Sequence, residues 1–129
     1  MRSGFAAACL LALGLTAAES HEISASYSAC MAKAAGATFA MQECITEELE
    51  VRDRHLNASY NAIMKSRAVS EKRRNQLRDV QRKWVAFRDA NCAFYDDQSG
   101  GQMARLAANE CVLRMTTDRA AELQTLKPE

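Results

Sequence analysis

Apolar residues recur at three- and four-residue steps over three long stretches of the chain, which is the spacing of one face of an α-helix. The first stretch is predicted as a helix from an N-cap at Thr38 to about Arg67, with Met41, Ile45, Leu49, Leu56, Tyr60 and Ile63 on its apolar face. The second follows an N-cap at Ser70 and has a seven-residue repeat built from Leu77, Val80, Trp84, Phe87 and Phe94. The third opens with the capping box Ser99-x-x-Gln102 and runs to about Leu126 through Met103, Leu106, Val112, Met115 and Leu123.

Residues that break helices are scarce. Pro128 is the one proline, and the only glycines after residue 18 are Gly36, Gly100 and Gly101. A short helix from about Ser26 to Ala35 fits before Gly36, which we expect to act as its C-cap. We therefore predict an all-α fold, a small antiparallel bundle of three long helices plus a short N-terminal helix.

The N-terminus has the pattern of a secretory signal peptide over residues 1–18, which leaves a single helical domain at residues 19–129. Arg2 precedes a short apolar run, and small residues end the segment before Glu19. The run is too short to span a bilayer, so no membrane anchor is expected after cleavage. The alternative is a lipoprotein attached through Cys9, but apolar residues still follow that cysteine, so we favour a periplasmic or secreted protein without a lipid.

The charge balance excludes some classes of partner. Loss of residues 1–18 lowers the Lys and Arg count from 17 to 16, equal to the 16 Asp and Glu. Neutrality argues against non-specific binding to nucleic acid or to membranes. Basic residues are nevertheless concentrated between Lys65 and Lys83, which indicates either a solvated surface or a face for an anionic partner.

Four cysteines remain after residue 18: Cys30, Cys44, Cys92 and Cys111. An even number in an exported chain indicates disulfides, and four cysteines allow three pairings. We favour Cys30–Cys44 and Cys92–Cys111, because each bridge then closes a short local loop. A zinc site is the alternative, but the close Cys-x-x-Cys spacing of such sites is missing. We therefore expect no metal and no cofactor.

Several polar residues interrupt the apolar faces. Asp53 lies between Leu49 and Leu56, and an unpaired buried carboxylate is costly. We predict that Asp53 accepts hydrogen bonds from an arginine of another helix, within a polar network formed by Asp53, Asn57, Gln81, Arg88 and Arg119. Such a network is either an internal clamp that fixes the helix register or a binding centre, and we favour the clamp.

Sequence motifs of catalysis are missing, so we do not expect an enzyme. His55 lies on a charged stretch, and no nucleophile elbow, zinc-protease motif or phosphate-binding glycine loop occurs. Adjacent acids such as Glu47-Glu48 and Asp96-Asp97 are more typical of a solvated helix face or turn than of a paired general acid and base.

Three blocks of residues resemble one bacterial family, the lysozyme-inhibitor LprI-like N-terminal domain family. The resemblance covers about residues 30–123 and rests on Asp53-x-x-Leu56-Asn57-x-x-Tyr60, on Leu77-Arg78-x-x-Gln81-Arg82-x-Trp84-x-x-Phe87-Arg88-Asp89-x-x-Cys92, and on Gly100-Gly101-x-Met103, Cys111 and Met115-Thr116-x-x-Arg119-Ala120-x-x-Leu123. It implies an exported helical domain with cysteine cross-links. This chain departs from the family in lacking a lipid-attachment cysteine and in having Gln102 where serine is common after the two glycines.

The resemblance also implies a function, binding to lysozyme in the bacterial envelope and inhibition by occlusion of its cleft. The candidate inhibitory element is the turn that contains Asp96, Asp97, Gly100, Gly101 and Gln102. An ordinary connection between two helices is the alternative for this turn. The alternative for the whole protein is a periplasmic scaffold or stress-related protein that binds another envelope protein or a cell-wall polymer. The oligomeric state is not predicted.

Overall fold

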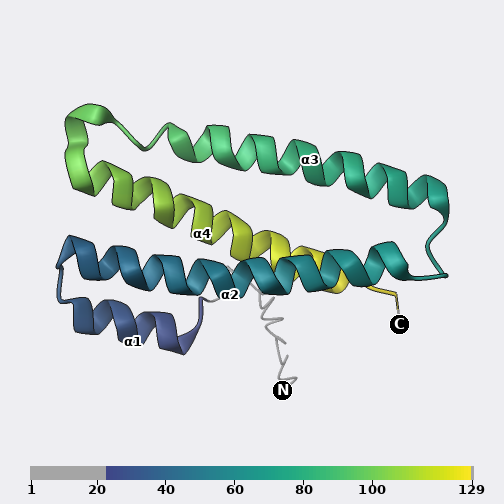
Figure 1. Ribbon diagram of the computed structural model, residues 1–129, viewed down its shortest axis with the longest axis horizontal. Coiled ribbons are helices and arrows are strands. Elements are labelled where there is room, and N and C mark those ends of the chain that lie inside the picture. The colour runs from purple at the N-terminus through teal and green to yellow at the C-terminus, as the bar shows by residue number, and fades with distance from the viewer. Residues whose placement is uncertain (1–22, 129) are drawn as a thin grey trace, which may run out of the picture.

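The computed structural model describes residues 23–128, so the predicted signal peptide at residues 1–18 lies outside the described part. Four α-helices follow one another, α1 (Ala25–Ala34), α2 (Thr38–Lys65), α3 (Glu71–Ala93) and α4 (Gly101–Thr125), with a short 3-10 helix, η1 (Gln98–Gly100), before α4. Consecutive helices run antiparallel (Figure 1), and residues 23–128 contain no strand. The predicted all-α bundle of three long helices plus a short one is confirmed.

Helices α2 and α4 form the centre of the bundle. Their side chains build two apolar clusters, one at each end of the helix pair. The first contains Leu56, Ile63, Ala120 and Leu123, and the second contains Ile45, Leu106 and Leu113. Removal of these side chains from water is the main source of the bundle's stability.

Helix α1 lies along the first half of α2 and is held there by a disulfide (Figure 1). Cys30 and Cys44 are bonded with their Cα atoms 5.7 Å apart, as favoured from the sequence. The helix ends at Ala34, and its C-cap Ala35 has a φ of 47°, in the left-handed region, followed by Gly36 with φ 83°. The predicted C-cap is therefore wrong by one residue, because Ala35 itself makes the turn that Gly36 then continues.

Helix α3 packs less closely than the other long helices and reaches the core mainly through Leu77 and Trp84. The prediction that its whole seven-residue repeat is buried is wrong. Val80, Phe87 and Phe94 are 49%, 60% and 86% exposed. A straight α-helix drifts about 20° per heptad relative to a seven-residue repeat, so each of these side chains lies further from the core than the one before.

Only one of the three predicted N-terminal helix caps has the predicted geometry. Ser70 caps α3 through a hydrogen bond from the Arg73 amide, at 3.4 Å. Thr38 is the first helical residue of α2 and not its cap, and Gly100 precedes α4 without a side-chain bond. The capping box expected at Ser99 does not form, because residues 98–100 form the 3-10 helix η1. Asp97 is the N-cap of that element.

Candidate functional site

The α3–α4 turn, residues 94–103, lies at one end of the bundle, the same end as the connection between α1 and α2 (Figure 1). Its first part continues the path of α3 for two residues, since the amides of Tyr95 and Asp96 donate to the Cys92 and Ala93 carbonyls at 3.1 Å each. Asp97 then starts η1 by accepting a hydrogen bond from the Ser99 amide at 2.9 Å. The turn is thus hydrogen-bonded along its length, although nearly all of its side chains are exposed.

The Asp97 carboxylate keeps its negative charge at this exposed position. The hydrogen bond from the Ser99 backbone amide, aided by the Ser99 side chain, holds the pKa of Asp97 below its usual value. Asp96 beside it is also exposed. The outer surface of the turn therefore presents two adjacent carboxylates.

The two glycines of the turn are required for different structural reasons. A Cβ on Gly100 would lie 2.7 Å from the Cβ of Ala104, which is closer than side chains approach. Gly101 has φ 61°, a left-handed conformation that costs a residue with a side chain about 1 kcal/mol. Both glycines are needed for α4 to begin directly after η1.

A disulfide braces the turn from inside the bundle. Cys92, at the end of α3, is bonded to Cys111 on α4, with their Cα atoms 5.4 Å apart. Both cysteines are buried, and the Asn91 amide contacts the Cys111 and Met115 sulfurs at 3.5 Å. The favoured pairing is confirmed, and the bridge ties the end of α3 to a point about three turns into α4.

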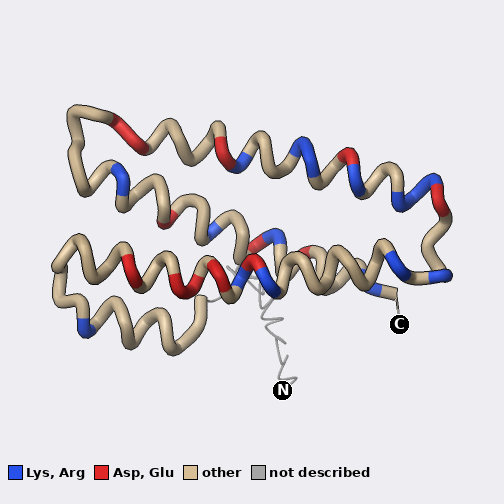
Figure 2. Tube along the Cα trace, viewed as in Figure 1, with Lys and Arg blue, Asp and Glu red and all other residues tan. Residues whose placement is uncertain are grey.

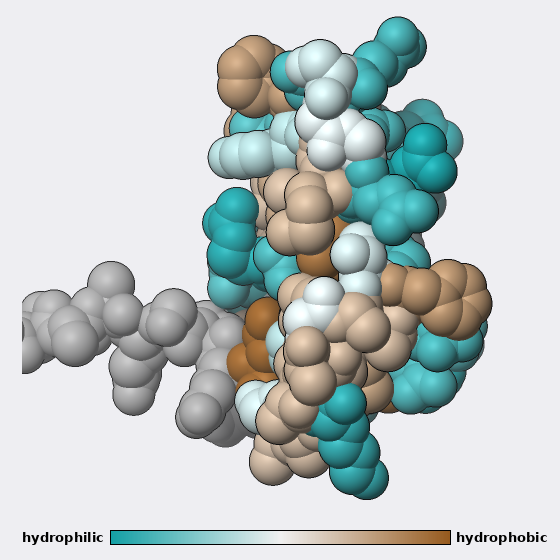
Figure 3. All heavy atoms as spheres, turned by 90° about the vertical axis from the view of Figure 1, so that its left-hand side faces the viewer, coloured by the Kyte–Doolittle hydropathy of each residue, from teal (hydrophilic) through white to brown (hydrophobic). Residues whose placement is uncertain are grey.

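Apolar side chains gather on the same end of the molecule. Phe94 and Tyr95 lie next to each other in an edge-to-face arrangement, with ring centroids 6.1 Å apart. Met103 and Phe39, the latter from the start of α2, are 60% and 77% exposed. Figure 3 shows hydrophobic atoms spread over this end between hydrophilic ones. Exposed aromatic residues on a rigid support are typical of protein-binding surfaces.

Comparison with known proteins places the chain in a family. The model of the family "Lysozyme inhibitor LprI" matches residues 30–123, which include α2, α3, the turn and most of α4. The chain belongs to the LprI family of lysozyme inhibitors. An uncharacterized protein of Rhizobium meliloti (strain 1021) is 24% identical to it over 95 residues, which are 64% of this chain and 68% of that protein. No solved structure matches the chain.

In this LprI-family protein, the residues of the predicted polar network meet around a groove between α2 and α3. Asp53, Asn57, Gln81 and Arg88 line the groove, and Arg119 reaches it by donating a hydrogen bond to Gln81, Nε to Oε1, at 3.0 Å. The pairing predicted for Asp53 is not formed. Within residues 23–128, the Asp53 carboxylate makes no hydrogen bond or ion pair with either arginine.

Both arginines instead pair with an acid on their own helix. Arg119 lies 2.6 Å from Glu122, and Arg88 lies 2.9 Å from Asp89. Across the helices, Arg88 donates to the buried Thr116 hydroxyl at 3.2 Å. Asp89 follows Arg88 by one residue, and Glu122 follows Arg119 by three. Each arginine pairs with this nearby acid, and the predicted cross-helix pair with Asp53 does not form.

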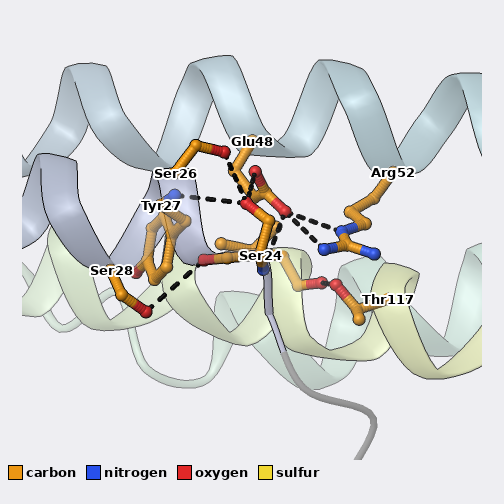
Figure 4. Close-up of polar contacts among 8 residues, drawn as sticks. Ser24, Ser26, Tyr27, Ser28, Glu48, Arg52 and Thr117 are labelled. Carbon is orange, nitrogen blue, oxygen red and sulfur yellow. Dashed lines mark hydrogen bonds and ion pairs between the residues drawn. The ribbon is translucent and has the colours of Figure 1, made fainter.

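Within residues 23–128 of this LprI-family protein, the buried carboxylate is that of Glu48, for which the sequence predicts a solvated helix face. The Glu48 side chain is 5% exposed. It belongs to α2 and lies against the start of α1 (Figure 4). The Ser24 hydroxyl donates to its Oε2 at 2.7 Å, and Arg52 donates to its Oε1 from Nε and Nη2, both at 2.7 Å. Burial by itself would raise the pKa of Glu48, but the hydrogen bonds from Ser24 and Arg52 outweigh it and hold that pKa below its usual value.

A spacing signal for Glu48 was present in the sequence. Glu48 follows Cys44 by four residues and Ile45 by three, and Arg52 follows Glu48 by four. Those steps place it on the buried face with a cation one turn away. The adjacent Glu47, which is exposed, masked the signal because the two were interpreted as a pair.

Two further expectations concern other kinds of site. Between residues 23 and 128, no helix combines the length and the apolar character needed to cross a membrane. In the same range, His, Cys, Asp and Glu side chains form no group of three or more that could hold a metal ion.

Proposed function

We propose that this protein is an exported envelope protein that inhibits lysozyme by inserting the α3–α4 turn into the enzyme's substrate cleft. Membership of the LprI family supports the activity. The observation that carries the choice of the turn is its construction, an exposed turn that is bonded within itself and tied to α4 by the Cys92–Cys111 disulfide. An inhibitor of a cleft enzyme needs a rigid protrusion, since ordering a flexible one would consume binding free energy.

The turn offers two kinds of contact to such an enzyme. Phe94 and Tyr95 supply exposed rings of the kind that dominate protein interfaces, and the apolar walls of a sugar-binding cleft suit them. Asp96 and Asp97 face the solvent, where they would meet the basic rim of a cationic, animal-type lysozyme and speed association. The rings are therefore assigned to affinity and the carboxylates to the rate of encounter.

A muramidase assay with increasing amounts of the purified protein tests the proposal. We expect lysozyme activity to fall to a low residual level once the protein is in molar excess. Phe94→Ala should weaken inhibition by about 30-fold or more, which corresponds to a binding hot spot of about 2 kcal/mol. Full lysozyme activity at a large excess of the wild-type protein would reject inhibition altogether.

A variant without the two charges distinguishes the role of the carboxylates from that of the aromatic rings. Asp96→Asn with Asp97→Asn should slow association and reduce its dependence on salt, while asparagine can still cap η1. The matched control is Asp79→Asn with Asp118→Asn, which removes two exposed carboxylates outside the turn. If the two double variants associate equally fast and inhibit equally well at every salt concentration, the carboxylates of the turn have no role in the encounter.

A further inference from the structure

The groove between α2 and α3 is a second feature with the character of a binding site. It has a volume of about 650 Å3, and its polar lining includes Asp53, Asn57 and Tyr60 from α2 and Arg78, Arg82 and Arg88 from α3. Arg78 and Arg88 are ten residues apart, so at about 1.5 Å per residue the lined length is about 15 Å. The groove lies away from the α3–α4 turn and belongs to no part of the proposed inhibitory element.

The groove is cationic although the protein as a whole is nearly neutral. Three arginines line it against the single carboxylate of Asp53. Lysines and arginines recur along α3, while acids are concentrated in the first half of α2 (Figure 2). Arg78 bonds only to the Asn75 amide oxygen, and within residues 23–128 Arg82 makes no hydrogen bond or ion pair. Two guanidinium groups are thus available to an incoming anion.

Arg119 is buried and does not itself line the groove, but it is bonded to Gln81, which does. Arg119 is 7% exposed, and its Nη2 has no hydrogen-bond partner among the described residues. The Arg119 guanidinium lies 6.0 Å from the Trp84 ring, a lining residue, and its Nε holds the Gln81 oxygen. Because that oxygen is engaged, the Gln81 amide presents its N–H donors.

We propose that the α2–α3 groove binds a short, extended peptide segment that carries carboxylates. Forked guanidinium groups suit carboxylates, and the spacing of Arg78 and Arg82 places both on one face of α3. Asn57 and Gln81 are amides, which match the donors and acceptors of a peptide backbone, and Asp53 accepts a backbone N–H. Five extended residues span about 17 Å, close to the length of the groove.

A peptide fits the lining better than a phosphate polymer does. Leu56 and Val85 give the groove apolar walls, on which the methylene groups of glutamate side chains can pack. Asp53 would repel a phosphate polymer, which carries a negative charge on every unit. A peptide instead offers Asp53 a backbone N–H to bind. The chemistry is the same for a free peptide and for an acidic segment of a protein, and the termini of the ligand distinguish the two.

Titration with pentaglutamate, followed by intrinsic fluorescence, tests the proposal. Trp84 is the protein's single tryptophan and lines the groove, so its emission reports directly on the site. We expect a saturable change with pentaglutamate, weaker binding at high salt, and none with pentalysine. A peptide with blocked ends that binds equally well indicates a protein segment, and binding that needs free ends indicates a free peptide.

A pair of charge-matched variants provides the control. Arg78→Gln with Arg82→Gln should weaken pentaglutamate binding at least tenfold, whereas Lys72→Gln with Arg73→Gln, exposed on the same helix outside the groove, should change it less than twofold. Three results would overturn the proposal: no fluorescence change up to millimolar peptide, equal weakening in both double variants, or tighter binding of tripolyphosphate than of pentaglutamate. The Arg78/Arg82 variant should inhibit lysozyme like the wild type, which keeps this test separate from that of the turn.

Discussion

The Glu48 carboxylate joins the start of α1 to the middle of α2. It accepts from both the amide and the hydroxyl of Ser24, the N-cap of α1, at 3.3 and 2.7 Å. It also lies at the positive end of the α1 dipole and pairs with Arg52 on its own helix. One ionised side chain therefore satisfies the first turn of α1 and balances a half-buried cation.

The stability of the fold should consequently depend on pH in the acid range. Because the pKa of Glu48 is lower in the folded state, its contribution is fully present above the unfolded value of about 4.3 and disappears as the pH falls through the lower folded value. Glu48→Gln should lower the free energy of unfolding at pH 7 by about 2 kcal/mol and flatten its decline below pH 5. Urea unfolding followed by circular dichroism measures both.

The neighbouring Glu47 offers the control for that measurement. It is exposed and bonded to nothing within residues 23–128, so Glu47→Gln should change the free energy of unfolding by less than about 0.5 kcal/mol. Equal losses in the two variants would show that Glu48 is not the buried partner of Ser24.

At the level of single residues, the sequence predicts which side chains lie near the core better than it predicts their partners. Asp53 and Arg88 both line the groove, yet the predicted pair does not form, because Arg88 pairs with the adjacent Asp89. For Glu48, helical spacing indicates a buried position, but it cannot indicate the partner Ser24, which is 24 residues away. Local spacing identifies a face, and only the packed structure selects the partner.

Among the helices, α3 shows how well a seven-residue repeat predicts which side chains are buried. The repeat predicted the helix, which is confirmed, and its residues Leu77 and Trp84 are partly buried against the core. It failed for Val80, Phe87 and Phe94, because a straight helix gradually rotates a seven-residue repeat away from its partner. The face that does meet α4 is largely polar, with Gln81 and Arg88 bonded across to it.

Two substitutions on α3 should therefore differ in effect. Leu77→Ala removes a side chain that packs on the core and should cost about 1–2 kcal/mol of unfolding free energy, below the range for a fully buried leucine. Phe87→Ala removes a larger side chain that is 60% exposed and should cost less than about 0.5 kcal/mol. Thermal or urea unfolding distinguishes them. A larger loss for Phe87→Ala would show that α3 is rotated relative to this description.

For the whole molecule, the two disulfides have different tasks. Cys30–Cys44 holds the short helix α1 on α2, while Cys92–Cys111 holds the end of α3, and with it the turn, on α4. The sequence predicted both bridges because each closes a short loop of consecutive helices. It could not predict the distance between α3 and α2, because that distance depends on the side chains between them. This separation leaves the groove open.

Removal of each bridge should separate stability from inhibition. Cys92→Ser with Cys111→Ser opens a loop with a sequence separation of 19 and should cost about 3 kcal/mol. It should also weaken lysozyme inhibition under conditions where the protein is still folded, because the turn loses its brace. Cys30→Ser with Cys44→Ser should destabilise the protein yet leave inhibition near the wild-type level. Inhibition by the first variant at full strength would mean that rigidity of the turn is not needed.

Hydrogen exchange of the protein alone and mixed with an animal-type lysozyme tests the central claim most directly. We predict that the amides of residues 94–103 exchange at least tenfold more slowly in the mixture, whereas those of the connection between α2 and α3, at the opposite end of the bundle, do not change (Figure 1). Unchanged exchange over residues 94–103, or slowing confined to another surface, would contradict the assignment of the turn as the lysozyme-binding element.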